Sequence, residues 1–295
     1  MKDYVILVDS ASEMTTEKRK EFGVDYIQMK IAYDGKEYPA SLDWDAYSAK
    51  ELYGWLRDGK RVTTMQVPPE DYRQAFAVYL EKGLDIFYLA CSSGLSGSIN
   101  AAILVAREME EKYPGSRVAV IDALNAGYCN AHMAIKAAEM KRDGKTIEEL
   151  IEWFEANKLK FNQIGTVETL TYLKRAGRIK GTAAFFGNIF SVKPIVINDA
   201  RGCNVAIKKI RGRKSSFEEI INMTKELIED PAGQVVHIGH ADCIEDAEYV
   251  KARLLAETGC RDADISYLGP IVGASTGPGT LIVYFYGKEV TVAGE

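Results

Sequence analysis

The amino-acid sequence predicts an α/β fold: an N-terminal domain with a mostly parallel, doubly wound sheet, and a C-terminal α/β domain with a mixed sheet and helices on one face. Strands and helices alternate through the first half, which is typical of a parallel sheet. The runs at residues 84–91 and 117–123 are apolar at nearly every position, as in strands covered on both faces. In the second half, a turn at residues 199–202 joins two strands into an antiparallel hairpin, which makes that sheet mixed.

The first half supplies the elements of the parallel domain. Besides the two apolar runs, strands are expected at residues 4–8 and 24–33, and Asp34-Gly35 is a hairpin signal after the second of these. Ser48-x-x-Glu51 resembles a capping box, although it would lie too deep in its helix to act as one. Helices are expected at about residues 45–57, 68–82, 99–112, 127–142 and 146–157.

The pattern changes near Lys158, so we expect domains at residues 1–158 and 159–295. A length of 295 residues exceeds one typical hydrophobic core, which also favours two domains. Besides the hairpin, the second half predicts strands at residues 161–167, 234–240 and 281–286, and helices near residues 168–176, 216–229 and 245–258.

The composition narrows the class of protein. A net charge of −5 argues against nucleic-acid binding, which needs a clustered basic surface. No run approaches the roughly 20 apolar residues that insert stably into a membrane. The five cysteines are odd in number and form no C-x-x-C pair, as expected for reduced thiols in a cytoplasmic protein. The one basic run, residues 208–214, is either a solvated hairpin end or a docking patch for an acidic partner.

The first candidate site is the strand-to-helix junction at residues 92–98. Ligands of open parallel sheets bind outside the carboxyl ends of the strands. Here that end carries four serines and two glycines, and the next helix offers free N–H groups to an anion. An ordinary capped turn explains the same residues equally well. The candidate ligands in this segment are Ser93, Gly94 and Ser96.

Two other segments carry hydroxyl groups. Thr63 and Thr64 lie just before a predicted helix, where they either cap it or bind a ligand. Residues 269–279 hold four glycines and two prolines, so we expect an irregular loop with a functional role. The candidate ligands in that loop are Gly273, Ser275 and Thr276.

Arg178 follows Gly177, which is expected to end a helix. Just past this cap, the arginine either points into a cleft or lies solvated on the surface. The segment at residues 183–190, which contains Phe186, is apolar and is expected either to line a binding tunnel or to form a core helix.

Groups suited to catalysis are scarce. His237 and His240 lie three apart on a predicted strand, hence on opposite faces, which disfavours a shared metal. Asp9, Asp122 and Asp199 follow strands; capping of the next turn is the commoner use of such carboxylates, although the first two could act as general bases or metal ligands. We expect no metal, no cofactor and no catalytic residue. A hydroxyl-rich, nearly uncharged site suits binding of an anionic headgroup better than acid–base catalysis.

Six motifs in order resemble the DegV family of bacterial fatty-acid-binding proteins over essentially the whole chain. The strongest is SSGLSGSINAA, which matches the pattern S-S-x-[LI]-S-G-[ST]. The others are VDSASEM, TTMQVPPEDY, LKRAGRI, SVKPIVINDARG and GPIVGASTGPGTLIVYFYG.

The resemblance implies a non-enzymatic binding subunit. Such a protein holds one long-chain fatty acid in a buried apolar tunnel, at or near the interface of its two domains. It presents the carboxylate to a separate ATP-dependent fatty acid kinase, whose acyl-phosphate product enters phospholipid synthesis. By resemblance, the carboxylate ligands are Thr63 or Thr64, Ser93 and Arg178. An enzyme acting on a small phosphorylated or carboxylated metabolite is the alternative reading.

One position departs from the family. The terminal loop of the family commonly reads G-x-H-x-G-P-G, with the histidine at the carboxylate, whereas this chain has Ser275 there. Serine still donates a hydrogen bond, but it carries no positive charge near neutral pH. We therefore expect Arg178 to supply the cation, or the headgroup to be held more weakly.

Overall fold

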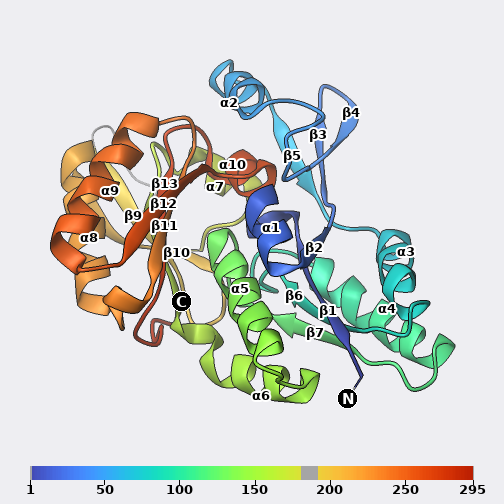
Figure 1. Ribbon diagram of the computed structural model, residues 1–295. Coiled ribbons are helices and arrows are strands. Elements are labelled where there is room, and N and C mark those ends of the chain that lie inside the picture. Colours follow the sequence, from blue (N-terminus) through green and yellow to red (C-terminus); the bar gives the residue numbers. More distant parts are fainter. Residues whose placement is uncertain (1, 181–191, 295) are drawn as a thin grey trace.

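The computed structural model of the chain describes residues 2–180 and 192–294 (Figure 1). Its N-terminal part contains a parallel sheet of four strands in the order β2-β1-β6-β7: β1 (Tyr4–Asp9), β2 (Val24–Ile27), β6 (Asp85–Ala90) and β7 (Val118–Asp122). One face carries α3 (Pro69–Leu80) and α4 (Ser98–Lys112), and the other carries α5 (Tyr128–Arg142) and α6 (Ile147–Asn157). The predicted doubly wound sheet is confirmed.

A small lobe projects from the parallel domain at the top of Figure 1. It consists of an antiparallel sheet, β3 (Lys30–Tyr33), β4 (Lys36–Pro39) and β5 (Val62–Met65), with α2 (Ala49–Arg57). The prediction of one strand at residues 24–33 was wrong, because the chain leaves the parallel sheet after Ile27 and starts a new sheet at Lys30. The Asp34-Gly35 hairpin turn is confirmed, with φ of 50° and 72°.

The capping box at Ser48 forms after all. The expectation that Ser48 lies inside its helix was wrong, since α2 begins at Ala49. Ser48 Oγ accepts from the Glu51 N–H at 3.2 Å, and Glu51 Oε2 accepts from the Ser48 N–H at 2.7 Å. This reciprocal pair satisfies two N–H groups that the first turn leaves without helical partners.

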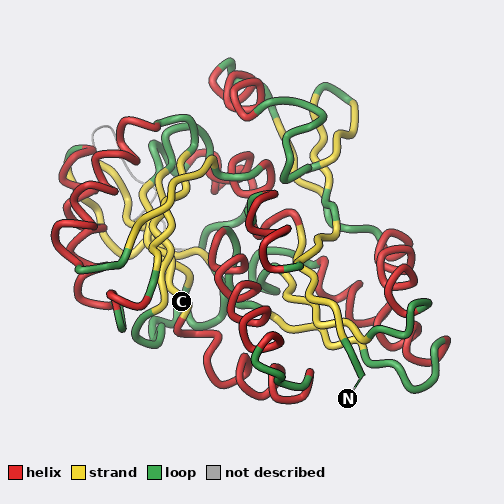
Figure 2. The backbone as a smooth tube through the Cα atoms, in the orientation of Figure 1, coloured by secondary structure: helices red, strands yellow, loops and turns green. Residues whose placement is uncertain are grey.

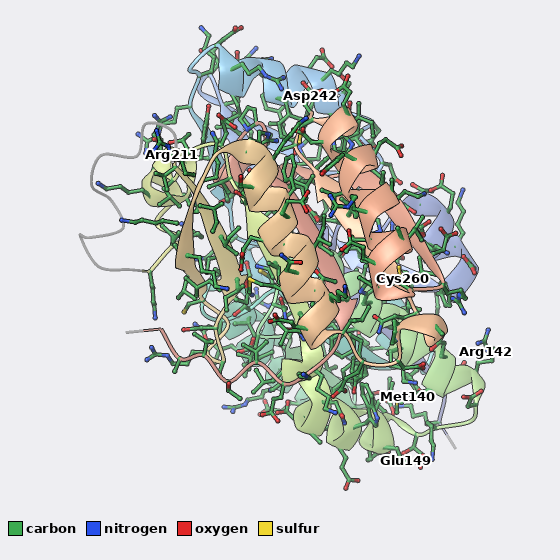
Figure 3. All side chains as sticks on the ribbon, turned by 90° about the vertical axis from the view of Figure 1, so that its left-hand side faces the viewer. Met140, Arg142, Glu149, Arg211, Asp242 and Cys260 are labelled. Atoms are coloured by element: carbon green, nitrogen blue, oxygen red, sulfur yellow. The ribbon has the colours of Figure 1, made fainter. Side chains whose placement is uncertain are left out.

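The C-terminal part contains a mixed sheet of six strands in the order β10-β9-β8-β13-β11-β12. The strands are β8 (Phe161–Thr166), β9 (Val192–Asn198), β10 (Asn204–Arg211), β11 (Val235–His240), β12 (Asp262–Tyr267) and β13 (Leu281–Tyr286). Within it, β11 and β12 run parallel, and the other neighbouring pairs run antiparallel. Both α8 (Arg213–Leu227) and α9 (Ile244–Thr258) cover one face, which Figure 3 turns toward the viewer. The predicted mixed sheet with helices on one face is confirmed.

Helix α5 lies between the two sheets and contacts strands of both (Figure 2). The alternation along β13 explains how both faces of the mixed sheet are buried. Leu281, Val283 and Phe285 pack beneath α8 and α9, whereas Ile282 and Tyr284 belong to the core of the parallel domain. The two parts of the chain therefore share an apolar seam.

Short elements complete the fold: α1 (Thr16–Phe22), α7 (Thr171–Ala176), α10 (Pro270–Thr276), and 3-10 turns at Ser10–Ser12, Lys158–Lys160 and Pro231–Gly233. The prediction that residues 269–279 form no regular element was wrong, because they contain α10. Pro270 occupies the first helical position, where its missing N–H costs nothing. Gly273 is required by packing, since a Cβ there would lie 2.4 Å from Tyr53 Oη.

The basic run at residues 208–214 includes the exposed end of the second strand of the β9–β10 hairpin. It forms the end of β10 and the start of α8, and Figure 3 labels Arg211 at this place. Lys208 pairs with Glu219 at 2.6 Å, and Arg213 pairs with Asp246 at 2.6 Å and Glu168 at 3.2 Å. Part of its charge is thus neutralised within the chain. Over the described ranges, no helix has the length and apolar character needed to cross a bilayer.

Candidate functional site

The turn after β6 is held against the mixed sheet. Ser92 Oγ donates to the Gly202 carbonyl oxygen at 2.7 Å, which ties the turn to the β9–β10 hairpin. A Cβ on Gly94 would lie 2.7 Å from Cys203 Sγ, so only glycine fits this approach. The turn therefore joins the carboxyl end of the parallel sheet to the second half of the chain.

Beside this turn lie three adjoining hollows. The outer one, here called the vestibule, measures about 210 Å³ and is lined from the lobe, α7 and α10. The second, the apolar hollow, measures about 70 Å³; its apolar lining includes Met29, Leu95, Ile271, Val272 and Ile282. The third measures about 20 Å³ and continues toward Val196 of the mixed sheet. The vestibule and the apolar hollow share three lining residues, Thr64, Arg178 and Ser275.

The place where the vestibule meets the apolar hollow is here called the neck. Several residues predicted from sequence converge there. Thr64, Arg178 and Ser275 line both hollows, whereas Thr63 lines the vestibule alone. Ser96 and Thr276 line the apolar hollow.

Three predicted residues lie elsewhere. Ser93 is exposed and lines none of the three hollows, and its backbone N–H donates to Asp122 Oδ1 at 3.1 Å. Gly94 and Gly273 serve close packing against Cys203 and Tyr53, as described above. Phe186 and the rest of residues 183–190 lie outside the described residues.

Arg178 has a defined position. Gly177, with φ of 69°, ends α7 as expected. Arg178 Nε then donates to the Leu95 carbonyl oxygen at 3.1 Å, and its Nη1 donates to the Ala176 carbonyl oxygen. No carboxylate among the described residues pairs with this guanidinium, so its charge is available to an anion at the neck.

The hydroxyl groups at the neck differ in their freedom. Ser275 Oγ donates to the Ile271 carbonyl oxygen at 2.9 Å, and Thr276 Oγ1 donates to the Val272 carbonyl oxygen at 2.9 Å. Within the described ranges, the Thr64 side chain has no hydrogen-bond partner. Thr64 can therefore donate to a ligand without breaking an existing bond, whereas Ser275 must first leave its helix carbonyl.

The three carboxylates that follow strands cap turns. Asp9 Oδ1 accepts from the Ala11 N–H at 2.9 Å, and Asp122 Oδ1 accepts from the Leu124 N–H at 3.1 Å. Asp199 Oδ1 accepts from the Cys203 N–H at 2.8 Å. Burial raises the pKa of Asp9, against its backbone and Tyr88 hydrogen bonds. These bonds favour the capping role over catalysis, and the described residues contain no cluster of three His, Cys, Asp or Glu placed to hold a metal.

Sequence reasoning missed lining residues of both the vestibule and the apolar hollow. Lys60 and Arg61 line the vestibule, and their position just before Thr63 was the available signal. Cys91, which is buried in the core, also lines the apolar hollow. Gln163 and Asn204 come to the hollow from β8 and β10, and no local motif marks either of them.

A larger cleft of about 470 Å³ opens further along the seam. Tyr128 and His237 stack there with ring centroids 3.3 Å apart, and His237 is only 2% exposed. Burial lowers the pKa of His237 well below its usual range. The His237 Nε2 lies 2.8 Å from Ser266 Oγ, which gives this ring a structural partner.

Glu13 and Tyr284, together called the wall here, are a buried hydrogen-bonded pair, and Tyr284 lies on β13 between Ile282 of the apolar hollow and Tyr286 of the cleft. Glu13 Oε1 accepts from the Gly269 N–H at 2.7 Å, and its Oε2 accepts from the Tyr284 hydroxyl at 3.2 Å. Burial nevertheless raises the pKa of Glu13 to about 8. This carboxyl also links the start of α10 to β13.

Comparison with known proteins agrees with this architecture. The family model described as "Uncharacterised protein, DegV family" matches residues 3–288. A DegV domain-containing protein of Clostridium perfringens is 36% identical over 288 residues, which cover 97% of this chain and 98% of that protein.

Solved structures of two relatives extend the match to three dimensions. A DegV family protein from Thermus thermophilus, described by its fatty acid binding, has a TM-score of 0.86 at 27% identity, covering 97% of this chain and 100% of that one. A Thermotoga maritima protein, described as revealing a fatty acid binding function, has a TM-score of 0.83 at 25% identity, covering 98% of this chain and 100% of that one. The chain therefore belongs to the DegV family.

Proposed function

We propose that this protein binds one long-chain fatty acid, with its carboxylate at the neck and its acyl chain in the apolar hollow. The fatty acid binding for which the Thermus thermophilus and Thermotoga maritima relatives are described supports this proposal. The observation that carries it is the neck itself. There Thr64, Arg178 and Ser275 stand between a polar vestibule and an apolar hollow.

The ligand chemistry fits a carboxylate. An arginine without a carboxylate partner and a free threonine hydroxyl supply a charge-assisted and a neutral hydrogen bond. Burial of the acyl chain adds about 0.8 kcal/mol per CH₂. The acyl chain of the lipid thus supplies most of the binding affinity, and the neck fixes the orientation of the bound lipid.

The apolar hollow is small for this task. Pockets for small molecules usually measure roughly 300–1,000 Å³, compared with about 70 Å³ here. Loading a long acyl chain therefore requires the walls of the hollow to move apart. Slower amide hydrogen exchange in α10 and β5 after loading would report this rearrangement.

We further propose that the protein presents the carboxylate to a separate ATP-dependent kinase in the cytoplasm and catalyses no step itself. The carboxylate end faces the vestibule, which a partner can reach from solvent through the exposed Thr63. The described lining of the vestibule and apolar hollow contains no His, Asp or Glu to act as acid or base. Burial also raises the pKa of Cys91 well above its usual range, which makes it a poor nucleophile.

Native mass spectrometry of freshly purified protein, followed by lipid extraction, tests the binding proposal. A single non-covalent adduct with a fatty-acid mass is expected, and lipid-stripped protein should take up added palmitate at one equivalent. A protein that is isolated empty and takes up neither palmitate nor oleate would contradict it. Kinase presentation has its own test, since a fatty acid kinase should phosphorylate the bound lipid faster than the free lipid.

A further inference from the structure

The cleft is separate from the neck and has the size of a binding site of its own. Its volume of about 470 Å³ falls within the range of roughly 300–1,000 Å³ that is usual for small-molecule pockets. Residues from α1, α5 and α6 line it together with residues from β11, β12 and β13. None of its described lining residues also lines the vestibule or the apolar hollow. Aromatic side chains supply much of its surface: Phe22, Tyr128, Trp153, Phe161 and Tyr286.

His237 faces this cleft with an unpartnered nitrogen. Val236 and Ile238 pack beneath α8 and α9, so the alternation along β11 turns His237 to the opposite face, where it lines the cleft. The side chain is buried, and its Nδ1 has no hydrogen-bond partner within the part of the chain that the structure describes. A buried polar atom without a partner costs free energy, which a bound ligand can restore.

The hydrogen bonds around the ring assign this nitrogen as an acceptor. The Ser266 hydroxyl donates to the Tyr267 carbonyl oxygen at 3.4 Å, and its oxygen lies 2.8 Å from His237 Nε2. Nε2 therefore carries the proton and donates to Ser266, which leaves a lone pair on Nδ1. Because burial holds the pKa of His237 well below its usual range, the ring stays neutral near neutral pH. The group that binds at Nδ1 must be a donor.

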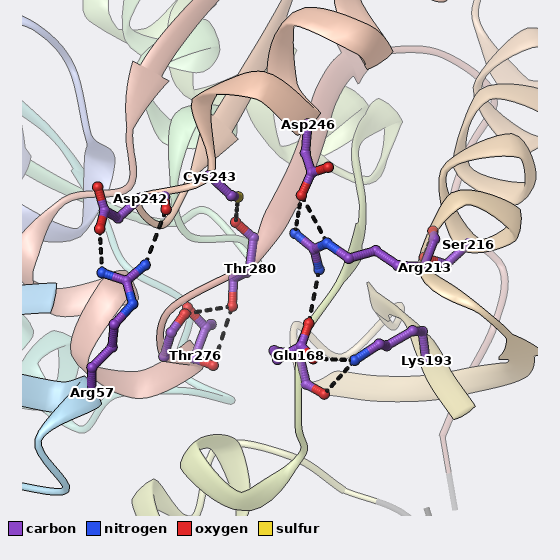
Figure 4. A network of polar contacts seen from close by, with 11 residues as sticks. Arg57, Glu168, Lys193, Arg213, Ser216, Asp242, Cys243, Asp246, Thr276 and Thr280 are labelled. Carbon is purple, nitrogen blue, oxygen red and sulfur yellow. Dashed lines mark hydrogen bonds and ion pairs between the residues drawn. The ribbon is translucent and has the colours of Figure 1, made fainter. Parts of the chain in front are cut away.

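The carboxylates of the cleft are acceptors too. Asp264 lies opposite His237 in the register of β11 and β12, where neighbouring strands are about 4.8 Å apart. Asp264 and Glu139 form no ion pair with any described residue, whereas Glu168 and Asp246, elsewhere in the C-terminal part, both bind Arg213 (Figure 4). The described lining of the cleft holds five carboxylates and three cations, so it is negative overall.

The aromatic surface suits an ammonium group as well. Lysines of the chain already lie over two of its rings: Lys18 Nζ is 5.8 Å from the Phe22 centroid, and Lys136 Nζ is 5.6 Å from the Trp153 ring. Such contacts are attractive because the face of an aromatic ring is negative. Glu21 pairs with Lys18 at 3.1 Å, which offsets the repulsion between this lysine and a second cation.

We propose that the cleft binds a small organic ammonium ion with an aromatic body, an arylalkylamine. The ammonium group has three donors and reaches both the Asp264 carboxylate and His237 Nδ1, while the ring of the ligand packs against the aromatic surface. An anion of the same shape meets carboxylates and a lone pair instead, and is rejected. The amine binds independently of the lipid, because the two spaces share no described lining residue.

Three probes of similar shape test this charge preference: phenethylamine, 2-phenylethanol and 3-phenylpropionate. Dissociation constants are measured by NMR titration with and without added palmitate. Phenethylamine should bind about tenfold or more tightly than the alcohol, and 3-phenylpropionate should bind most weakly. Asp264→Asn, which keeps the shape of the side chain, should weaken amine binding about tenfold and change alcohol binding by less than about twofold. The matched control Asp262→Asn, on the same strand but outside the cleft lining, should behave as the wild type does.

Histidine ¹⁵N NMR gives an independent readout. His237 Nδ1 should resonate as an unprotonated nitrogen, and its signal should shift on addition of phenethylamine but not of 3-phenylpropionate. A proton on Nδ1, equal affinities for the amine and the anion, or unchanged amine binding in Asp264→Asn would overturn the inference. So would the absence of amine binding at about 10 mM. Displacement of the amine by palmitate would place it in the lipid site and would overturn the inference as well, without affecting the proposed fatty-acid function.

Discussion

The cleft and the vestibule differ in size and in charge. The cleft, at about 470 Å³, is more than twice as large as the vestibule, at about 210 Å³. Yet the cleft is lined by charges of both signs, such as Lys136, Glu139 and Asp264, whereas the described lining of the vestibule carries cations only. By volume alone the cleft would be the better candidate for the lipid site, whereas the charges of the lining residues favour the vestibule. We weigh the chemistry more heavily, because an amphipathic anion needs an apolar space that ends at a cation.

One face of strand β13 contributes side chains to both the apolar hollow and the cleft. Along β13, Ile282 lines the apolar hollow, Tyr284 lies in the wall and Tyr286 lines the cleft. These three side chains point the same way because strand positions alternate between faces. Tyr284 therefore lies between the two spaces along this strand.

The largest effect is expected at this wall, in the variant Glu13→Gln. Burial raises the folded-state pKa of Glu13 to about 8, above its ordinary value of 4.5. The folded state thus prefers the neutral carboxyl, so the stability of the wild type falls as pH rises from about 4.5 to about 8. Glutamine stays neutral and keeps an acceptor, so this loss should vanish. The variant should gain up to roughly 1.4 kcal/mol per pH unit over the wild type. Urea unfolding at several pH values measures this, and parallel pH profiles of the two proteins would contradict it.

The next largest effect is expected from a charge in the apolar hollow. Val272→Asp should weaken palmitate binding by at least about 100-fold, because the acyl chain would desolvate a carboxylate. Val272→Ala removes only two carbons and should cost about tenfold. Ile135→Asp places the same charge in the cleft and should leave palmitate affinity unchanged. If Ile135→Asp rather than Val272→Asp abolished binding in folded protein, the lipid would belong in the cleft.

Loss of the neck cation should have an intermediate effect. Arg178→Ala should weaken palmitate binding by about 10- to 100-fold, as expected for a lost charge-assisted hydrogen bond. Binding of methyl palmitate, which has no carboxylate, should barely change. Equal losses for both ligands would mean that Arg178 acts through packing. Fluorescence displacement assays with both ligands provide the measurement.

The smallest effect is expected from restoring the family histidine. Ser275→His should bind palmitate about 3- to 10-fold more tightly than the wild type at pH 6. A bound carboxylate raises the histidine pKa, so the gain is present at low pH and is lost as pH rises through that pKa. The neutral variant Ser275→Gln should show no such dependence. A Ser275→His protein with the same affinity at pH 6 and pH 8 would place residue 275 away from the headgroup.

The sequence predicted the fold because strand patterns and turn signals are local. The apolar strand at residues 85–90, the hairpin at Asp34-Gly35 and the helix end at Gly177 each depend on nearby residues. Helix α10 was missed because its glycines suit contacts that only the folded chain creates, such as Gly273 against Tyr53.

The candidate site was predictable in part. Thr64 and Arg178 stand in family motifs, and both lie at the neck. Ser93 stands in the strongest motif but points elsewhere, and Ser96 from the same motif reaches the hollow. Turn geometry decides between the two serines, and serine spacing alone does not encode it. The role of Asn204 in the lining could not be predicted, because the mixed sheet brings this residue to the hollow from a distant segment of the sequence.

Photocrosslinking tests the central claim most directly. A palmitate analogue with a diazirine near the carboxylate would be loaded, irradiated and mapped by peptide mass spectrometry, with unlabelled palmitate as competitor. We predict adducts on the segments around Thr64, Ser96 and Ser275, with none around Ile135 or Trp153. Competable adducts confined to the cleft would contradict the account and would place the lipid on the other side of the Glu13–Tyr284 wall.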